Sequence, residues 1–303
     1  MTKSKRPILT VLIILAVIAL LLGSSIFFVL KMGGPSTDLA FLNKIGVIPI
    51  DGPIVESQPI TSQLIKFRKD KKIKAIVLRI NSPGGAVGPT QEIYREIRKT
   101  VAQKKVVASL GAVAASGGYY IASAADRVVA NPGTITGSIG VIMEFLRLDE
   151  MMDKIGVKFE VLKSGEFKDI GSPHRPLTTR DREIIDSLIA DIQGQFVAAV
   201  ATGRGLPLEK VKEIADGRVF SGARAKELDL VDDLGNFEDA VDAAKALVGI
   251  KGDVTLVYPR KNRMEIWKSL IRNTTRSITR LFQNIQPRFE YRWGGMATSP
   301  TMR

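Results

Sequence analysis

Hydrophobic and polar positions divide the chain into three parts. Residues 8 to 30 form a run of 23 residues without a charged side chain. Between residues 33 and 260, short β-forming runs alternate with stretches of helical period, and after residue 260 apolar positions are interspersed with basic ones. We therefore predict a short N-terminus and membrane anchor over 1–32, a folded domain over 33–260 and a basic amphipathic tail over 261–303.

The first hydrophobic run is long enough to cross a bilayer, because 23 helical residues span about 35 Å against an apolar core of roughly 30 Å. It is also longer than the roughly 7 to 15 apolar residues of a cleaved secretory signal, so we expect it to be retained. Lys3, Lys5 and Arg6 precede the run, and only Lys31 follows closely. This asymmetry favours a single-pass protein of the cytoplasmic membrane, with its N-terminus in the cytoplasm and its folded domain outside.

The alternation in the central part predicts an α/β domain with a largely parallel sheet. In such folds, reactive groups gather on loops at the carboxyl ends of the strands. We expect strands at 45–50, 75–80, 106–110, 128–130 and 159–162, and helices near 62–69, 90–103, 115–124 and 181–201.

The net charge of +13 is concentrated at the two ends of the chain. Residues 1–32 carry four basic and no acidic side chains, residues 261–303 carry nine basic and two acidic, and only +2 is left for the domain. A nucleic-acid enzyme would concentrate basic charge in its folded body, so we expect no nucleic-acid partner. Anionic lipid is the simpler partner for the basic ends.

The basic tail contains apolar residues at helical spacing, beginning with Met264, Trp267 and Leu270. Such a helix suits either a membrane interface or packing on protein, and the pattern leaves both open. After Pro287 the periodicity stops, and the rest is expected to be a mobile tail.

Composition narrows the possible chemistry. There is no cysteine, so thiol nucleophiles and thiolate metal sites are excluded. The one histidine, His174, lies between Pro173 and Pro176, where it is poorly suited to activate a serine. We expect neither a metal nor an organic cofactor, and a lysine is the best base for a covalent hydrolase.

Three glycine-rich turns follow expected strands, at 81–85, 111–118 and 131–140. Paired glycines at Gly84 and Gly85 let backbone N–H groups approach a ligand, as an oxyanion hole requires, although a plain tight turn has the same pattern. Ser116 and Ser138 lie in the other two turns. The residues alone do not choose between them as nucleophile.

Five motifs in order resemble the signal peptide peptidase A family in its short, single-repeat form. They are Asn-Ser-Pro-Gly-Gly at 81–85, Ala-Ala-Ser-Gly-Gly-Tyr-Tyr at 114–120, Thr-Gly-Ser-Ile-Gly-Val at 136–141, Ser-Gly-Glu-Phe-Lys at 164–168 with Ser-Pro at 172–173, and Asp-Gly-Arg-Val-Phe-Ser-Gly at 216–222. The resemblance covers about residues 43 to 250. It implies a crotonase-like or Clp-protease-like fold of repeated ββα units and a membrane-bound serine protease.

The resemblance also implies roles for individual residues. Ser138 matches the family nucleophile and Lys168 the general base of a Ser-Lys dyad, while Gly85 matches an oxyanion donor. Gly84 and Ile139 flank these positions and complete the expected oxyanion and substrate-binding set. Ser116 remains the leading rival, because its turn resembles the nucleophile turn of the distant Clp-type proteases.

Lys168 must be neutral to accept a proton, so its site must desolvate it or place another cation nearby. The plain alternative is a solvated surface lysine. Glu166 and Asp169 flank it, and either would raise its pKa by pairing with it, so the catalytic role requires both to point away.

The expected activity is hydrolysis of peptide bonds in cleaved signal peptides or other membrane-associated polypeptides through an acyl-enzyme. The alternative is a non-catalytic scaffold of the same fold that assembles at the membrane. The resemblance implies a homo-oligomeric ring, because members of the family form rings and a chain with one repeat would have to build its cavity by self-association.

Overall fold

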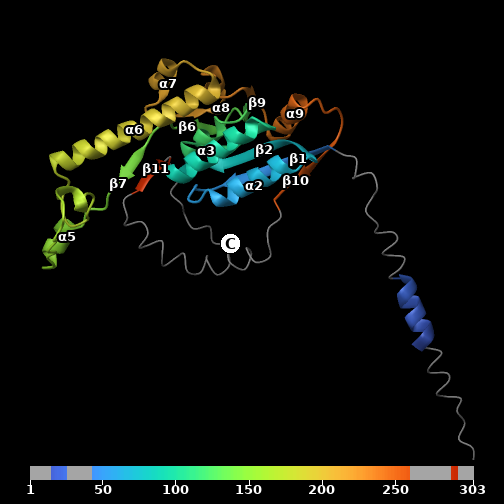
Figure 1. Ribbon diagram of the computed structural model, residues 1–303, viewed down its shortest axis with the longest axis horizontal. Coiled ribbons are helices and arrows are strands. Elements are labelled where there is room, and N and C mark those ends of the chain that lie inside the picture. The colour runs from blue at the N-terminus through green and yellow to red at the C-terminus, as the bar shows by residue number, and fades with distance from the viewer. Residues whose placement is uncertain (1–14, 26–42, 260–287, 293–303) are drawn as a thin grey trace, which may run out of the picture. The chain divides into compact units, whose positions relative to one another are not determined.

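The computed structural model describes residues 15–25, 43–259 and 288–292, and the chain divides into two units, Met1–Leu42 and Asn43–Arg303 (Figure 1). In the first unit the helix Leu15–Ser25 is apolar and exposed along its length. It lies within the predicted span 8–30, whose other residues are outside the described ranges. The expected tail helix after residue 260 also lies outside them.

The second unit is built on a mixed sheet whose main path is parallel. Its order is β10-β1-β2-β4-β5-β9, with β6 added beside β4 and with β8 antiparallel to β6. The bounds are β1 (Asn43–Asp51), β2 (Ile73–Ser82), β4 (Lys105–Ala115), β5 (Arg127–Ala130), β6 (Ile135–Gly137), β8 (Val219–Ser221), β9 (Asp233–Leu234) and β10 (Val254–Val257). The predicted α/β class with largely parallel strands is confirmed.

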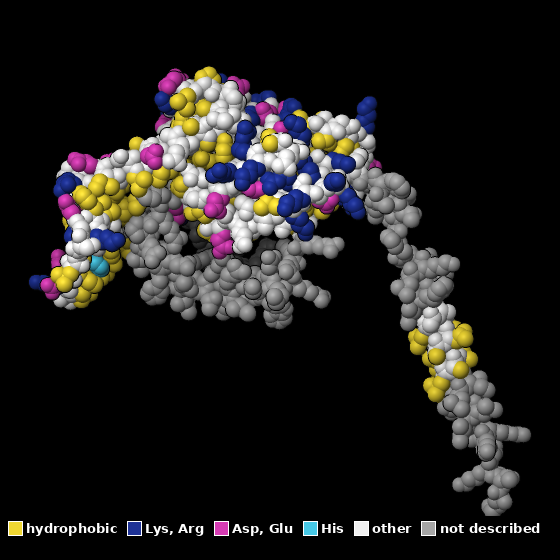
Figure 2. All heavy atoms as spheres, in the orientation of Figure 1, with side chains coloured by type: hydrophobic (Ala, Val, Ile, Leu, Met, Phe, Trp, Pro, Cys, Tyr) yellow, Lys and Arg dark blue, Asp and Glu magenta, His cyan; other side chains and the backbone are white. Residues whose placement is uncertain are grey.

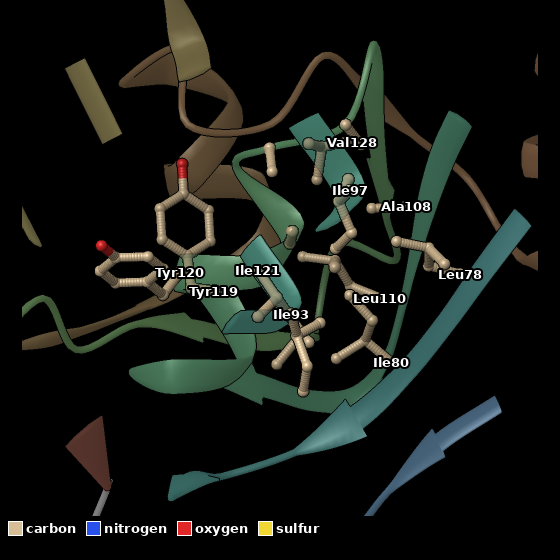
Figure 3. Packing of buried hydrophobic residues seen from close by; sticks show 14 of the residues in the cluster. Leu78, Ile80, Ile93, Ile97, Ala108, Leu110, Tyr119, Tyr120, Ile121 and Val128 are labelled. Carbon is tan, nitrogen blue, oxygen red and sulfur yellow. The ribbon is translucent and has the colours of Figure 1, made fainter. Parts of the chain in front are cut away.

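The period-two alternation of the strands divides their side chains between two hydrophobic cores. On one face Ile76, Leu78 and Ile80 pack beneath the helices α2 to α4 and α6, and Figure 3 shows part of this cluster. On the other face Ala75 and Val77 pack beneath α9. Continuous Val and Ile runs are needed because both faces of the sheet are covered. The helices are α2 (Gln58–Lys69), α3 (Val87–Val101), α4 (Gly117–Ala122), α6 (Thr179–Arg204), α7 (Leu208–Ile214), α8 (Gly222–Glu227) and α9 (Phe237–Leu247).

A second, three-stranded antiparallel sheet has the order β3-β11-β7. It joins β3 (Gly84–Ala86) and β7 (Ile142–Glu144) through β11 (Arg288–Arg292), which comes from near the C-terminus. The prediction of a mobile tail after Pro287 was therefore wrong for these five residues. No local periodicity predicts that these residues form a strand, because the two strands that they pair with are distant in sequence.

Residues 145–178, between β7 and α6, form what we call the arm. It contains α5 (Asp149–Lys154) and the short 3-10 helix η2 (Glu166–Asp169). Figure 1 shows α5 beyond the N-terminal end of α6, away from the sheet. The strand expected at 159–162 is absent, and Phe159 and Leu162 are exposed. These residues have β propensity but no neighbouring strand to pair with.

The helix α6 is by length and composition apolar enough to cross a bilayer. A Thr178 capping box begins it, Gly205 ends it in the left-handed region, and Phe196 and Val200 enter the hydrophobic core. Core helices of globular domains meet the same criteria, so we interpret α6 as part of the domain.

Candidate functional site

The two serine-bearing turns lie side by side at the carboxyl ends of adjacent strands. β4 and β6 are parallel and pair Ala115 with Gly137, so the residue that follows each is a serine. The Ser116 backbone N–H donates to the Gly137 carbonyl at 2.8 Å. The sequence placed the second turn at 111–118, but β4 continues to Ala115 and the turn begins only at Ser116.

Ser116 and Ser138 share a backbone conformation that L-residues rarely adopt. Their φ angles are 52° and 51°, and Asp229 is the only other non-glycine residue with positive φ in the described ranges. Such conformations cost about 1 to 3 kcal/mol and persist at functional sites where the surrounding fold enforces them. Backbone strain alone therefore makes both turns candidate catalytic sites.

Ser116 has further features of a nucleophile. It lies between the end of β4 and the start of α4, with ψ at −118°, in the strand–turn–helix position that presents a hydroxyl in nucleophile elbows. Its side chain is 1% exposed, and its Oγ has no hydrogen-bond partner among the described residues. A buried hydroxyl without a partner costs about 1 to 3 kcal/mol, which a purely structural serine would avoid.

The glycine pair packs directly against this turn. A Cβ added to Gly117 would lie 3.2 Å from both the Gly84 Cα and the Gly85 nitrogen. Gly84 O accepts from Ile54 N–H, and Ala86 N–H donates to Ile54 O, both at 2.8 Å. Because alternate residues of a strand turn their polar groups to opposite sides, the N–H of Gly85 faces away from Ile54, towards β11.

Ser138 is held differently. Its side chain is 6% exposed, and its N–H donates to the Arg218 carbonyl at 2.9 Å. The next residue, Ile139, is fully buried, and its carbonyl accepts from the Gly217 N–H at 3.1 Å. Within the described ranges the Ile139 N–H donates to no acceptor.

Lys168 lies elsewhere, in η2 of the arm, with an exposed side chain. Among the described residues no hydrogen bond or ion pair joins it to Ser116 or Ser138. Its two acidic neighbours are engaged with other cations. Glu166 pairs with Arg180 at 2.7 Å, and Asp169 pairs with Arg175 at 2.9 Å and with Lys163 at 2.7 Å.

The hydrogen bond from Arg175 is the main cause that lowers the pKa of Asp169, with that from Lys163 second. The Asp169 carboxylate therefore stays charged and paired with Arg175 over the whole physiological pH range. The catalytic role predicted for Lys168 requires Glu166 and Asp169 to point away from it. Each of these carboxylates is paired with another cation in the structure.

His174 takes no part in the serine turns. Its ring stacks on Phe159 in the arm, with centroids 3.8 Å apart and planes 17° from parallel. No group of three or more His, Cys, Asp or Glu side chains that could hold a metal ion occurs in the described part of the chain. The cavity of about 430 Å³ lined by Arg147, Asp149 and Glu150 belongs to the arm rather than to the turns.

The strand β11 covers the glycine pair, which the sequence did not predict. Tyr291 pairs with Gly85, and a Cβ added to Gly84 would lie 1.9 Å from the Tyr291 carbonyl oxygen and 2.7 Å from the Gly117 nitrogen. The backbone of β11 thus passes directly over the N–H groups beside Ser116. Only the pairing of Arg288–Arg292 with strands far away in sequence reveals this.

The Tyr291 side chain is fully buried in an aromatic cluster behind the turn. Its ring stacks on Tyr120 at 5.1 Å and meets Phe196 at 4.7 Å, and its hydroxyl donates to the Ile192 carbonyl at 3.2 Å. Burial raises the pKa of Tyr120 to about 12, so this wall of the site stays uncharged. The Tyr-Tyr pair at 119–120 was visible in the sequence, but its contact with the C-terminal strand was not.

These features together define a class of protein. It is an α/β domain in which two serines with strained backbones lie at the ends of strands, beside a strand that contains a pair of glycines. Residues 37–134 match the Clp protease family, and residues 98–251 match peptidase family S49. The chain belongs to peptidase family S49, and it resembles the signal peptide peptidase A proteins of that family.

Three relatives illustrate the likeness. A candidate protease of Synechocystis sp., slr0021, is 47% identical over 69% of this chain and 76% of its own. A candidate protease of Methanocaldococcus jannaschii, MJ0651, is 31% identical over 84% and 86%. A candidate signal peptide peptidase SppA of Enterococcus faecium is 33% identical over 79% and 74%.

Proposed function

We propose that this protein is a membrane-anchored serine endopeptidase that hydrolyses signal-peptide remnants or other membrane-associated polypeptides through an acyl-enzyme. Its membership of peptidase family S49 supports peptide-bond hydrolysis. The observation that carries the mechanism is the buried hydroxyl of Ser116, which has no hydrogen-bond partner among the described residues and lies on a strained turn against Gly85.

We assign the attack to Ser116, and Ser138, the nucleophile that the resemblance implies, is the rival next to it. After attack by Ser116, the N–H groups of Gly85 and Gly117 would stabilise the oxyanion. Attack by Ser138 would instead use the N–H of Ile139, which meets no acceptor within residues 43–259 and 288–292. In either case the base takes the serine proton and gives it to the leaving amine as the peptide C–N bond breaks, which leaves an acyl ester on the serine. Water then attacks this ester, and the C–O bond to the serine breaks to release the new carboxyl end of the peptide and the free serine hydroxyl.

The substrate is proposed to bind as an added strand along β3. This edge accepts an antiparallel strand, because β11 pairs there with Gly84, Gly85 and Ala86. Backbone hydrogen bonds of this kind give affinity without requiring a particular sequence. A substrate peptide would have to displace β11.

Lys168 is proposed as the general base, supplied by a neighbouring copy in a homo-oligomer. Its side chain is exposed in the single chain, and the arm around it exposes Met151, Ile155 and Leu162. Apolar groups on a protruding segment are typical of a surface that another subunit covers. Packing against that copy would take Lys168 out of water, as a proton acceptor needs.

The decisive experiment is labelling of the full chain with a fluorophosphonate probe that reacts with activated serines. We expect labelling of the wild type and of Ser138→Ala, and none of Ser116→Ala. Loss of labelling in Ser138→Ala alone would transfer the nucleophile to Ser138. An unlabelled wild type that still assembles would contradict the enzyme and favour the scaffold.

The membrane location is proposed from the helix Leu15–Ser25 within the longer uncharged run. The basic residues before the run favour a cytoplasmic N-terminus. A protease added outside the cytoplasmic membrane should therefore digest the domain, after any outer membrane has been opened. Protection until the cytoplasmic membrane is lysed would contradict this orientation.

A further inference from the structure

One corner of the domain carries far more positive charge than its sequence average suggests. Residues 66–74 hold six basic and one acidic side chain, and residues 95–105 hold five basic and one acidic. These two segments, which we call the basic edge, therefore carry +9. Since residues 33–260 together carry only +2, the rest of the domain carries −7.

The fold brings the two segments together. Arg68 at the end of α2 donates to the Thr100 hydroxyl of α3 at 3.2 Å, and Lys104 donates to the carbonyls of Phe67 and Asp70, both at 2.7 Å. Burial is the main cause that lowers the pKa of Lys104, and the nearby charge of Lys74 lowers it further. Figure 2 shows Lys and Arg side chains gathered where Figure 1 places α2 and α3.

Acidic groups neutralise part of this charge, including Asp126, which pairs with Lys105 at 2.8 Å. Glu96 pairs with Arg68 and lies 3.5 Å from Lys99, and the Asp70 carboxylate accepts from the Lys72 backbone N–H. Lys71, Lys72 and Lys74 are exposed and form no ion pair within the described ranges. Like charges crowded on a surface repel one another, so an anionic partner would stabilise the basic edge.

The basic edge is also where the chain enters the domain from its proposed membrane anchor. β1 begins at Asn43, and the next residue, Lys44, pairs with Ile73 beside the lysine cluster. Seventeen residues separate Asn43 from the end of the helix Leu15–Ser25. A bilayer is therefore the one anionic surface that the chain itself keeps close to this edge.

The serine turns lie at the opposite end of the same strands. β2 and β4 begin at Ile73 and Lys105 and run in parallel to Ser82 and Ala115. At about 3.3 Å per residue, a ten-residue strand separates the two ends by about 30 Å.

We propose that the basic edge docks on the anionic lipid headgroups of the membrane that holds the anchor. This inference rests on the proposed anchor but not on the proposed peptidase chemistry. Docking keeps the serine turns about 30 Å above the headgroups. Substrates would then be polypeptide segments that have left the bilayer, rather than helices still embedded in it.

The absence of cysteine makes a site-specific test straightforward. A fluorophore is attached at Ala102→Cys, an exposed position of the basic edge, or at Gly133→Cys, an exposed position at the other end of the sheet where an added Cβ meets nothing within 4 Å. The full chain is reconstituted in phosphatidylcholine vesicles with or without phosphatidylglycerol. Quenching by a lipid with a spin-labelled headgroup reports how close the label lies to the surface.

We expect quenching at position 102 to rise severalfold when phosphatidylglycerol is present, and to fall again at high salt, since each lysine near an anionic surface strengthens binding about fivefold. Position 133 should not respond. Lys71→Glu with Lys72→Glu should abolish the increase, whereas the matched pair Lys210→Glu with Lys212→Glu in α7 should keep it.

Equal quenching at position 102 in both lipids would overturn the proposal, as would a response to soluble polyglutamate or DNA that exceeds the response to lipid. Equal responses at 102 and 133 would also overturn it. Two further measurements separate this result from the proposed function. Retention of the protein in vesicles at high salt tests the anchor, and fluorophosphonate labelling of the Lys71 and Lys72 variants tests the active serine.

Discussion

The turn at Ser116 and the arm around Lys168 are both short, glycine-containing stretches of sequence, but the fold determines them to very different degrees. Strands, a helix and β11 surround Ser116, and this packing holds its φ at 52°. Lys168 has an exposed side chain on a segment with few buried residues. One half of the proposed dyad is therefore preorganised within a single chain, and the other half depends on what covers the arm.

The comparison is tested most strongly by Lys168 itself. Lys168→Ala and Lys168→Arg should each lower kcat/KM by about 10² to 10⁴, because arginine keeps the charge but cannot accept a proton. Thermal unfolding should not change, since the side chain is exposed. Steady-state hydrolysis of a small ester across pH gives the answer, and substantial turnover by Lys168→Arg with the wild-type pH profile would exclude Lys168 as the base.

Mixing two inactive variants tests whether the base comes from another copy. Ser116→Ala and Lys168→Ala should regain activity when they are mixed and reassembled, up to about one quarter of the wild-type level if each site draws on two randomly mixed subunits. Ser116→Ala mixed with the double variant Ser116→Ala, Lys168→Ala is the control, because no mixed site then has a nucleophile and the mixture should stay inactive. Assembly without recovered activity would show that both groups act within one chain.

Stability should separate the two regions sharply. Tyr291→Ala removes a fully buried ring beside Tyr120 and should lower the free energy of unfolding by about 3 to 5 kcal/mol. Leu162→Ala changes a side chain that is 92% exposed, so it should alter the stability of the single chain by less than about 0.5 kcal/mol while weakening self-association. Denaturant titration and sedimentation measure the two effects, and a large loss of monomer stability in Leu162→Ala would contradict the assignment of the arm as a subunit surface.

Gly85→Ala should cost about 2 to 4 kcal/mol, because the new Cβ would lie 2.1 Å from the Ile54 carbonyl oxygen. Gly88→Ala is its matched control three residues later, in α3, with nothing within 4 Å. That change should be neutral or should stabilise the helix by up to about 1 kcal/mol. Similar thermal shifts in the two variants would mean that the close approach at Gly85 is not rigid.

The smallest expected effect is on the arm at low pH. The hydrogen bond from Arg175 lowers the pKa of Asp181 to about 2 from an ordinary 3.8, and lowers that of Asp169 as well. A depressed pKa contributes stability that is present above pH 3.8 and is lost as pH falls towards 2. The protection factors of the arm, which correct for the slower intrinsic amide exchange at low pH, should therefore fall below pH 4 in the wild type, and Arg175→Gln should show lower protection factors already at neutral pH.

The short sequence periods predicted much of the domain because they depend on neighbours close in the chain. The strands expected at 45–50 and 75–80 and the helix expected at 181–201 are present, since alternating Val and Ile runs and a capped amphipathic stretch each define their own element. The strand expected at 159–162 failed because a strand also needs a partner. β11 was missed for the converse reason, since its partners β3 and β7 lie far away along the chain.

For the site, the sequence alone supplied the motifs: the glycine pair at Gly84 and Gly85, the two serines and the lysine, together with their family. It could not rank Ser116 against Ser138 on physical grounds, because strain and burial are properties of packed neighbours. Only the tertiary structure set Gly85, Gly117 and the Ser116 hydroxyl, which has no hydrogen-bond partner in the described part of the chain, against one another beneath β11. The local sequence pattern specifies which helices and strands form. The position of a reactive group depends on contacts between backbone segments that are distant in sequence, and no local pattern encodes these contacts.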